Sequence, residues 1–321
     1  MRLIVILIVL TAILVTPVSA QTKLQYIYEP EGSWEFTNCR QVEIGGQFSM
    51  ICVNGNIVLA DNSFNKIGDT RHIRVFSTSG KLIRKWGSFK RPAGIVRDKP
   101  GNYYVLDSQT SKVYKYSSKY KPIKSWGGEG IGEGQMKFPT GIAIDINDCL
   151  YVCDKSSKRV TKFSTDGKYL GQFGEDVLQL PLSIAADKKG NIWVADKTLL
   201  RKFDQKGKPI DSYNLDLGES LILLSTIAVA PDGIVHAGTL SNPYSMICGI
   251  NPNGELISAS MSASQAPKGS SAREQDYYDG APSGICFIKD KMYVVDAPRF
   301  RIMVFHKHVL TAAEKRQLES D

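Results

Sequence analysis

Long apolar runs are absent after residue 20, so no later stretch predicts a membrane-spanning helix. The one apolar run, Leu3–Val15, is shorter than the roughly 20 residues that a span needs. It follows Arg2, and it is followed by Pro17 and by small residues that end at Ala20. This pattern predicts a Sec-type signal peptide over residues 1–20, cleaved after Ala20. The mature protein is then expected to be secreted or periplasmic, without a stable membrane anchor.

A regular disulfide framework is absent too, although the chain has six cysteines. Cys149 and Cys153 would lie about 13 Å apart on a strand, and a disulfide needs Cα atoms within about 7 Å. Since a chain of this length can bury a large core, it does not need such staples.

Runs of like charge are also missing. Without residues 1–20 the chain has 39 lysines and arginines against 32 aspartates and glutamates, a net charge of +7, and these charges are scattered along the sequence. A moderately basic chain permits an anionic partner without requiring one. Because export is expected, we expect no nucleic-acid partner.

A unit of four short apolar segments recurs along the chain and decides the fold class. In the copy that spans Phe138–Gly174 the segments are Gly141–Ile144, Leu150–Cys153, Val160–Phe163 and Tyr169–Phe173, separated by turn residues. Four short strands joined by tight turns form an antiparallel meander. Six copies follow one another, beginning at Ser49, Arg91, Phe138, Leu180, Ser225 and Pro282.

An aspartate ends the second segment of five copies, and Gly238 stands there in the other copy. These residues are Asp61, Asp107, Asp154, Asp196 and Asp296, with a mean step of 47 residues between copies. That step matches the roughly 40–50 residues of a four-stranded propeller blade. The sequence therefore predicts an all-β, six-bladed β-propeller of four-stranded antiparallel blades over residues 21–309.

The last copy supplies only three strands, so the ring needs a fourth strand from elsewhere. The apolar segment Leu24–Tyr28 precedes the first copy, and we expect it to pair with the last blade and close the ring. Residues 310–321 form a polar tail, in which Thr311 and Glu314 predict a capping box on a short helix.

The unit resembles an NHL repeat. It has a glycine-rich loop "GGEGIGEG", then Phe138-Pro139, a Gly-Ile-Ala strand, an apolar strand that ends in Asp154, Arg159 before a valine, and a closing Phe163. The resemblance covers nearly the whole mature chain and implies a six-bladed propeller. The family includes proteins that bind protein or RNA and relatives with lyase or hydrolase activity, so the fold does not define an activity.

Metal sites known from relatives of this fold are not indicated. Hydrolytic relatives of the gluconolactonase kind hold calcium with carboxylates and amides at the channel mouth. The matching positions here are Ser49, Ala93, Thr140, Leu182 or Ser183, Thr226 and Ser283, and none is acidic. Zinc lyases that resemble this fold use several histidines, whereas His72, His236, His306 and His308 occupy unlike blade positions. We therefore expect no metal and no cofactor.

We expect two kinds of repeated residue to have structural roles. The five aspartates are expected to accept hydrogen bonds from the following turn and to pair with cations that precede the third strand. The cysteines stand where other copies have alanine and pack as small apolar residues. Cys52 and Cys286 are in register in the first and last copies, so a disulfide that latches the ring stays an open alternative.

Departures from the repeat suggest where a ligand binds. Insertions at Asn62–Arg71 and Ser262–Gly284 should lie on one loop face, which mixes cations with tyrosines. The candidate ligand-binding residues are Lys112, Arg159, Arg201, Tyr244, Tyr277, Tyr278, Arg299 and Arg301.

From this face we expect a monomeric, non-catalytic module that binds a protein, peptide or glycan. The alternative is a lyase or hydrolase with an active site at the channel mouth.

Overall fold

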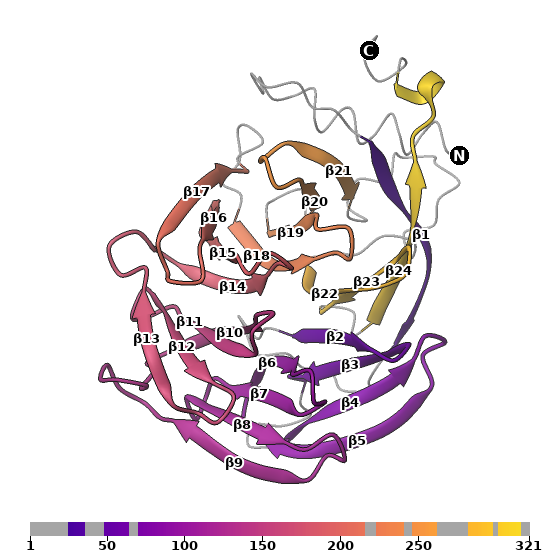
Figure 1. Ribbon diagram of the computed structural model, residues 1–321. Helices are drawn as coiled ribbons and strands as arrows, with labels where there is room; N and C mark the ends of the chain where they lie inside the picture. Colours follow the sequence, from indigo (N-terminus) through magenta and orange to yellow (C-terminus); the bar gives the residue numbers. More distant parts are fainter. Residues whose placement is uncertain are drawn as a thin grey trace.

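The computed structural model describes residues 25–35, 48–63, 70–215, 223–240, 246–261, 282–297 and 301–315, and these residues form 24 strands and one short helical turn. The strands group into six antiparallel blades of four around a central axis (Figure 1). The predicted all-β, six-bladed propeller is therefore confirmed. In each blade the chain starts at the axis and steps outward strand by strand.

The first three blades each consist of four consecutive strands. Blade 1 contains β2 (Ser49–Val53), β3 (Asn56–Asp61), β4 (Arg71–Ser77) and β5 (Leu82–Phe89). Blade 2 contains β6 (Pro92–Arg97), β7 (Tyr103–Asp107), β8 (Lys112–Tyr116) and β9 (Pro122–Gly127). Blade 3 contains β10 (Pro139–Ile144), β11 (Cys149–Asp154), β12 (Arg159–Ser164) and β13 (Tyr169–Phe173).

The remaining blades complete the ring. Blade 4 contains β14 (Pro181–Ala186), β15 (Ile192–Asp196), β16 (Leu199–Phe203) and β17 (Pro209–Asn214). Blade 5 contains β18 (Leu223–Val229), β19 (Val235–Leu240), β20 (Met246–Ile250) and β21 (Leu256–Met261). Blade 6 contains β22 (Pro282–Ile288), β23 (Lys291–Asp296), β24 (Arg301–Val309) and, on its outer edge, β1 (Tyr26–Glu35).

The hydrophobic core lies between neighbouring blades. Six separate clusters of buried side chains fill the six spaces, and each cluster draws on two adjacent blades. Inner strands come so close that a Cβ on Gly94 would lie 2.6 Å from Ile142 Cγ2 of the next blade. Glycine at this position of β6 therefore allows the close approach of blade 3.

Ring closure follows the prediction and extends it. β1 pairs antiparallel with β24 from Tyr26↔Val309 to Glu35↔Arg301, so it is the fourth strand of blade 6. It is longer than the expected Leu24–Tyr28 segment, whose first residue lies outside the described residues. β1 also pairs parallel with β21 of blade 5 at Tyr26↔Ser258, which joins blades 5 and 6 into one eight-stranded sheet.

The chain after β24 begins with the predicted capping box. Thr311 Oγ1 accepts a hydrogen bond from Glu314 N at 3.3 Å, and Glu314 Oε2 accepts one from Thr311 N at 2.7 Å. The two residues thus satisfy each other's backbone donors at the start of a single helical turn. The boundary of a separate tail at residue 310 stays a prediction.

A disulfide fastens the same closure near the axis. Cys52 in β2 and Cys286 in β22 are bonded, with Cα atoms 5.8 Å apart and a sequence separation of 234. The bond joins the inner strands of the first and last blades, so the alternative that the sequence left open is the one observed. Among the described residues, Cys149, Cys153 and Cys248 are free.

Removing this disulfide should weaken the whole ring, because a crosslink over 234 residues restricts the unfolded chain strongly. We expect the Cys52→Ala/Cys286→Ala variant to lose about 3–5 kcal/mol of unfolding free energy in denaturant titration. The control is Cys153→Ala, at a buried free thiol in register with Ala195, and it should cost only about 1 kcal/mol. An unchanged unfolding midpoint of the native protein after reduction would contradict this role.

Candidate functional site

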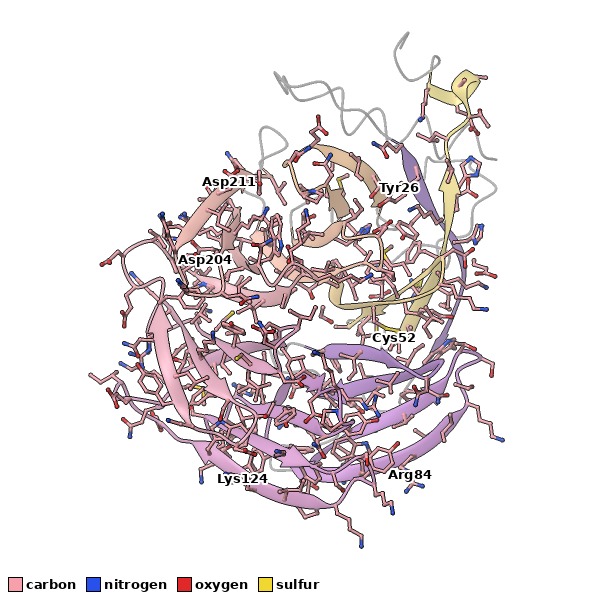
Figure 2. The ribbon with its side chains drawn as sticks, in the orientation of Figure 1. Tyr26, Cys52, Arg84, Lys124, Asp204 and Asp211 are labelled. Carbon is pink, nitrogen blue, oxygen red and sulfur yellow. A yellow bond between two sulfur atoms is a disulfide. The ribbon has the colours of Figure 1, made fainter. Side chains whose placement is uncertain are left out.

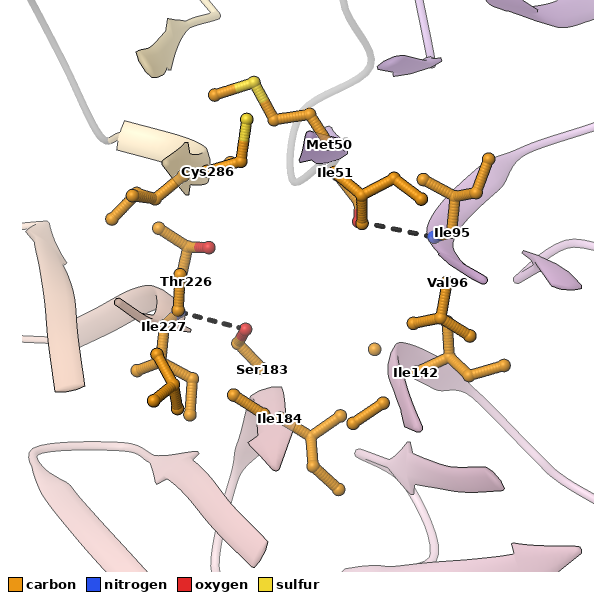
Figure 3. A pocket seen from close by; sticks show the side chains of 18 of the residues that line it. Met50, Ile51, Ile95, Val96, Ile142, Ser183, Ile184, Thr226, Ile227 and Cys286 are labelled. Atoms are coloured by element: carbon orange, nitrogen blue, oxygen red, sulfur yellow. Dashed lines mark hydrogen bonds between the residues drawn. The ribbon is translucent and has the colours of Figure 1, made fainter. Parts of the chain in front are cut away.

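A central channel runs along the axis and is the main cavity of the described structure. Its volume is about 660 Å³, and residues of all six inner strands line it. Figure 3 shows the open centre ringed by aliphatic side chains, among them Ile51, Ile95, Ile142, Ile184 and Ile227. The apolar middle suits the nonpolar part of a small molecule, so polar recognition has to come from the two ends.

Hydroxyl groups gather at the end where the inner strands begin. They belong to Ser49, Thr140, Ser183, Ser225, Thr226 and Ser283. In the described part of the channel the inner-strand starts thus carry hydroxyls in five blades and Ala93 in blade 2, and none of them carries a carboxylate. Of the two residues considered in blade 4, Ser183 lines the channel.

Several of these hydroxyls bind the neighbouring blade. Ser49 Oγ accepts from Ile95 N at 3.3 Å, and Ser183 Oγ accepts from Ile227 N at 3.1 Å (Figure 3). Thr140 Oγ1 donates to Pro181 O at 2.9 Å. These bonds tie one inner strand to the next, so they contribute to the structure of the ring.

Ser283 differs from the others. Its Oγ is buried against the channel wall and has no hydrogen-bond partner among the described residues. A buried hydroxyl without a partner costs about 1–3 kcal/mol. Ser283 therefore has a donor that no described residue uses, and its side chain would have to turn towards the channel to reach a ligand. The Thr226 hydroxyl likewise has no hydrogen-bond partner among the described residues.

The opposite end carries charged residues that are engaged in turns. Asp98 accepts from Asn102 N at 2.6 Å and from the Tyr104 hydroxyl at 2.7 Å. Lys188 donates to Pro231 O at 2.5 Å. These groups close hairpins and link blades, which leaves the hydroxyl end better suited to a ligand.

The five repeated aspartates have structural roles, as predicted, and they also bind a second loop that was not expected. Asp154 accepts from Ser156 N and Ser157 N of the following turn, both at 3.2 Å. It also accepts from Lys137 N at 2.6 Å and Phe138 N at 2.9 Å, in the connection that leads into its own blade. One carboxylate therefore holds both loops at the same end of a blade.

Truncating this aspartate should destabilise the fold without a change in chemistry. Asp154→Ala leaves four backbone N–H groups without their acceptor, so we expect a loss of about 2–4 kcal/mol in denaturant unfolding. The control is Asp176→Ala, an exposed carboxylate outside the strands, which should change the unfolding free energy by less than about 0.5 kcal/mol. Equal effects of the two substitutions would rule out the clamp.

The structure describes four of the predicted ligand-binding residues, and two are buried. Arg159 is 4% exposed, and its guanidinium donates to Ile131 O and Gln135 O at 3.1 Å, inside the glycine-rich loop. Arg301 is 6% exposed and binds Asp296 at 2.8 Å. Arg201 binds Asp196 at 2.7 Å. These arginines hold loops and offer little surface to a ligand.

Lys112 is the exposed member of this set. Tyr244, Tyr277, Tyr278 and Arg299 lie outside the described residues, so the proposed loop face stays a prediction for them. The expected pairing of Arg159 with its own blade aspartate does not occur, since this arginine binds loop carbonyls instead. The position of Arg159 in the repeat did not predict that it binds a loop and not the aspartate.

His236 is buried behind the channel wall. Aligning the copies by sequence alone sets His236 beside Val152 and Val194, but the strand pairing shows that the register is shifted by one. His236 pairs with Ala228, as Tyr151 pairs with Ala143 and Trp193 with Ala185. His236 thus stands at a position that is aromatic in blades 3 and 4. There the Tyr151 hydroxyl and Trp193 Nε1 each donate a hydrogen bond to the aspartate six residues earlier in the sequence.

In blade 5 Ala230 replaces that aspartate, and His236 Nδ1 has no hydrogen-bond partner in the described structure. Its Nε2 lies 3.5 Å from the Tyr26 hydroxyl of β1. Burial lowers the pKa of His236 to about 3. The neutral imidazole is therefore part of the packing beneath the closing strand.

This burial predicts a pH dependence of stability. The unfolded chain takes up a proton near pH 6.5, whereas the folded His236 does so only near pH 3. Unfolding free energy should therefore fall as the pH drops from about 6.5 towards 3, by about 3–5 kcal/mol from this group. The variant His236→Phe should lose that part of the dependence in denaturant titrations at pH 7 and pH 4. An identical pH profile for both proteins would contradict it.

Metal ligands do not converge in the described structure: no group of three or more histidine, cysteine, aspartate or glutamate side chains is placed to hold an ion. None of the described helical residues forms a segment that could cross a membrane.

No protein-family model and no curated protein matches the chain, but solved structures do. One is virginiamycin B lyase from Staphylococcus aureus, with 12% identity and a TM-score of 0.58, covering 85% of this chain and 98% of that one. A catalytically inactive histidine-to-alanine variant of that lyase with quinupristin has 12% identity and a TM-score of 0.59 over 85% and 98% of the chains. A protein provisionally designated a gluconolactonase has 10% identity and a TM-score of 0.59 over 88% and 98%.

At these identities the likeness shows a shared fold. The named activities of these neighbours run against our expectation of a non-catalytic binding module, and that expectation is corrected. The alternative, a lyase or hydrolase, is the interpretation that they favour.

Proposed function

We propose that the protein is an enzyme of the lyase or hydrolase class that takes its substrate into the hydroxyl-lined end of the central channel. The observation that carries the proposal is the channel itself, a cavity of about 660 Å³ with an apolar middle and one hydroxyl-rich end. The neighbours with lyase and gluconolactonase names share this fold, which supports the choice of class.

The described residues suggest how a substrate would be held. Ser283 has an unused hydroxyl that, once turned towards the channel, would donate a hydrogen bond to a carbonyl oxygen of the substrate. A donor held beside a carbonyl also stabilises the negative charge that develops there during ester or lactone cleavage. The aliphatic wall removes water around that contact. The described channel wall contains no histidine, so its contribution is substrate binding and polarisation.

Export and the NHL type of the repeats belong to the same proposal. The disulfide between Cys52 and Cys286 supports export, because structural disulfides persist in oxidising compartments and are rare in the cytosol. The regular aspartate clamps support the repeat type.

The proposal predicts turnover of a lactone or cyclic ester by the purified protein. D-glucono-1,5-lactone and quinupristin are suitable first substrates, each assayed by mass spectrometry with and without divalent cations. A hydrolase product gains the mass of one water, whereas a lyase product keeps the mass of its substrate when a ring opens. Folded protein that turns over neither these compounds nor a wider panel of lactones would contradict the proposal.

Two channel variants separate binding from folding. Ser283→Ala should lower kcat/KM by about tenfold or more, since one lost donor to a developing charge costs that much. It should not lower Tm and should raise it slightly, because the buried hydroxyl that it removes has no partner. Thr140→Val removes a bond between blades and should lower Tm by a few degrees. If Ser283→Ala lowered Tm and left kcat/KM unchanged, Ser283 would be a structural residue.

A further inference from the structure

Positive charge is concentrated on two neighbouring blades. We expected the charges to be scattered, and that expectation missed this concentration. Residues 70–127, which contain the two outer strands of blade 1 and all of blade 2, hold 14 lysines and arginines against two aspartates, a net charge of +12. The whole chain carries only +8, so all other residues together are slightly acidic, at −4. The two aspartates, Asp98 and Asp107, are buried at 5% and 1% exposure and accept hydrogen bonds from backbone N–H groups. They do not neutralise the surface.

The exposed cations lie on the outer edge of the propeller, away from the channel. The outer parts of the two blades are β5 in blade 1, and β9 with the turn that leads into it in blade 2. Figure 2 shows Arg84 and Lys124 there, at the rim of the propeller. We call this surface the basic rim. Its exposed cations are Lys81, Arg84, Lys85, Lys119, Lys121 and Lys124.

Cations face one another across strands in this region. Arg74 of β4 lies directly opposite Lys85 of β5, and Lys115 of β8 lies opposite Lys124 of β9. Like charges directly opposite on neighbouring strands destabilise a sheet. Blade 4 shows the ordinary arrangement at the corresponding place, where Lys202 faces Asp211.

Internal partners relieve only part of this repulsion. Arg74 binds Asp61 at 2.6 Å, and Lys115 binds Asp166 at 3.0 Å. Arg84 lies over the ring of Tyr120, with Cζ 5.0 Å from its centroid, and has no acidic partner among the described residues. A fold that keeps such repulsion on two neighbouring blades is consistent with an outside partner that supplies the negative charge.

Apolar side chains are interleaved with the cations. Leu82, Ile83 and Ile123 are 47%, 53% and 52% exposed on the same two outer strands. Tyr120 stacks on Tyr103 with ring centroids 5.5 Å apart, so the Tyr120 ring on which Arg84 lies is held in place. Nucleic acid presents mainly phosphate to a basic surface, whereas a sugar polymer with carboxylates presents anionic groups and apolar ring faces together.

We propose that the basic rim of blades 1 and 2 binds an acidic polysaccharide and so places the channel near polymer outside the cytosol. This goes beyond the proposed enzymatic function and does not depend on it. The choice of polysaccharide over nucleic acid rests on the mixed cationic and apolar surface and on the disulfide, which favours an oxidising compartment.

The test compares two variants of the full chain that lose the same number of exposed charges. The rim variant is Arg84→Gln/Lys85→Gln/Lys119→Gln/Lys121→Gln. The control variant is Lys168→Gln/Lys189→Gln/Lys206→Gln/Lys208→Gln, at exposed lysines of blades 3 and 4. Binding to fluorescent polygalacturonate is measured by anisotropy at several salt concentrations, with neutral dextran, duplex DNA and phosphatidylglycerol vesicles as the other probes.

We expect the rim variant to bind polygalacturonate at least about tenfold more weakly at about 0.15 M salt, with a smaller salt dependence. The control should stay within about twofold to threefold of the native protein. The rim variant should melt no lower than the native protein, because Lys85→Gln removes the repulsion with Arg74.

Three results would overturn the proposal. One is an equal loss of affinity in both variants, which would mean that net charge alone acts. Another is no binding of the native protein to polygalacturonate at about 0.15 M salt. The third is tighter binding of duplex DNA or vesicles than of polygalacturonate at equal charge concentration. Lactone turnover is measured in the same samples, so failure of the rim and failure of the enzymatic proposal are told apart.

Discussion

The pairing of β1 with β24 is the interaction on which the rest of the structure depends. A propeller blade buries its two faces only against neighbours, so the hydrophobic cluster between blade 6 and blade 1 exists only in a closed ring. The last copy of the repeat supplies three strands, and the N-terminal segment adds the fourth. At the inner edge of the same blade, the Cys52–Cys286 disulfide holds the opposite end of the closure. Outer and inner strands of blade 6 are therefore both tied to distant parts of the chain.

Much of the fold could be predicted from the sequence because most copies of the repeat have the same kind of residue at the same position. Aspartate after the second strand, glycine where inner strands meet and small residues in the second position all recur, so each copy supports the others. Register across the ring also made the Cys52–Cys286 pair visible as an alternative. Cysteine spacing alone could not decide it, because both residues also suit a small-residue packing position.

The errors arose where one residue depends on a partner that the repeat does not show. His236 was compared with valines, and its true counterparts are Tyr151 and Trp193, because the β18–β19 hairpin fixes the register. Arg159 was placed on a binding surface, and the structure buries its guanidinium against carbonyl groups of the glycine-rich loop, 24 to 28 residues earlier in the sequence. Neither partner can be inferred from local spacing. The free hydroxyl of Ser283 was hidden for the same reason, since its neighbours are bonded across blades.

Charge was misjudged for a different reason. Counted along the chain, lysines and arginines are well spaced, but a meander folds distant positions onto one edge. Arg74 and Lys85 are eleven residues apart in the sequence and directly opposite in the sheet. The electrostatic energy of two charges depends on their distance in space and not on their separation in the sequence. Charges within a Debye length of about 8 Å add their fields. The imbalance is already present in the sequence, since residues 70–127 carry +12 and all other residues together −4, and the meander then brings the exposed cations of this stretch onto one rim. Because the rim lies on the outer strands and the channel on the inner ones, the two surfaces can change independently.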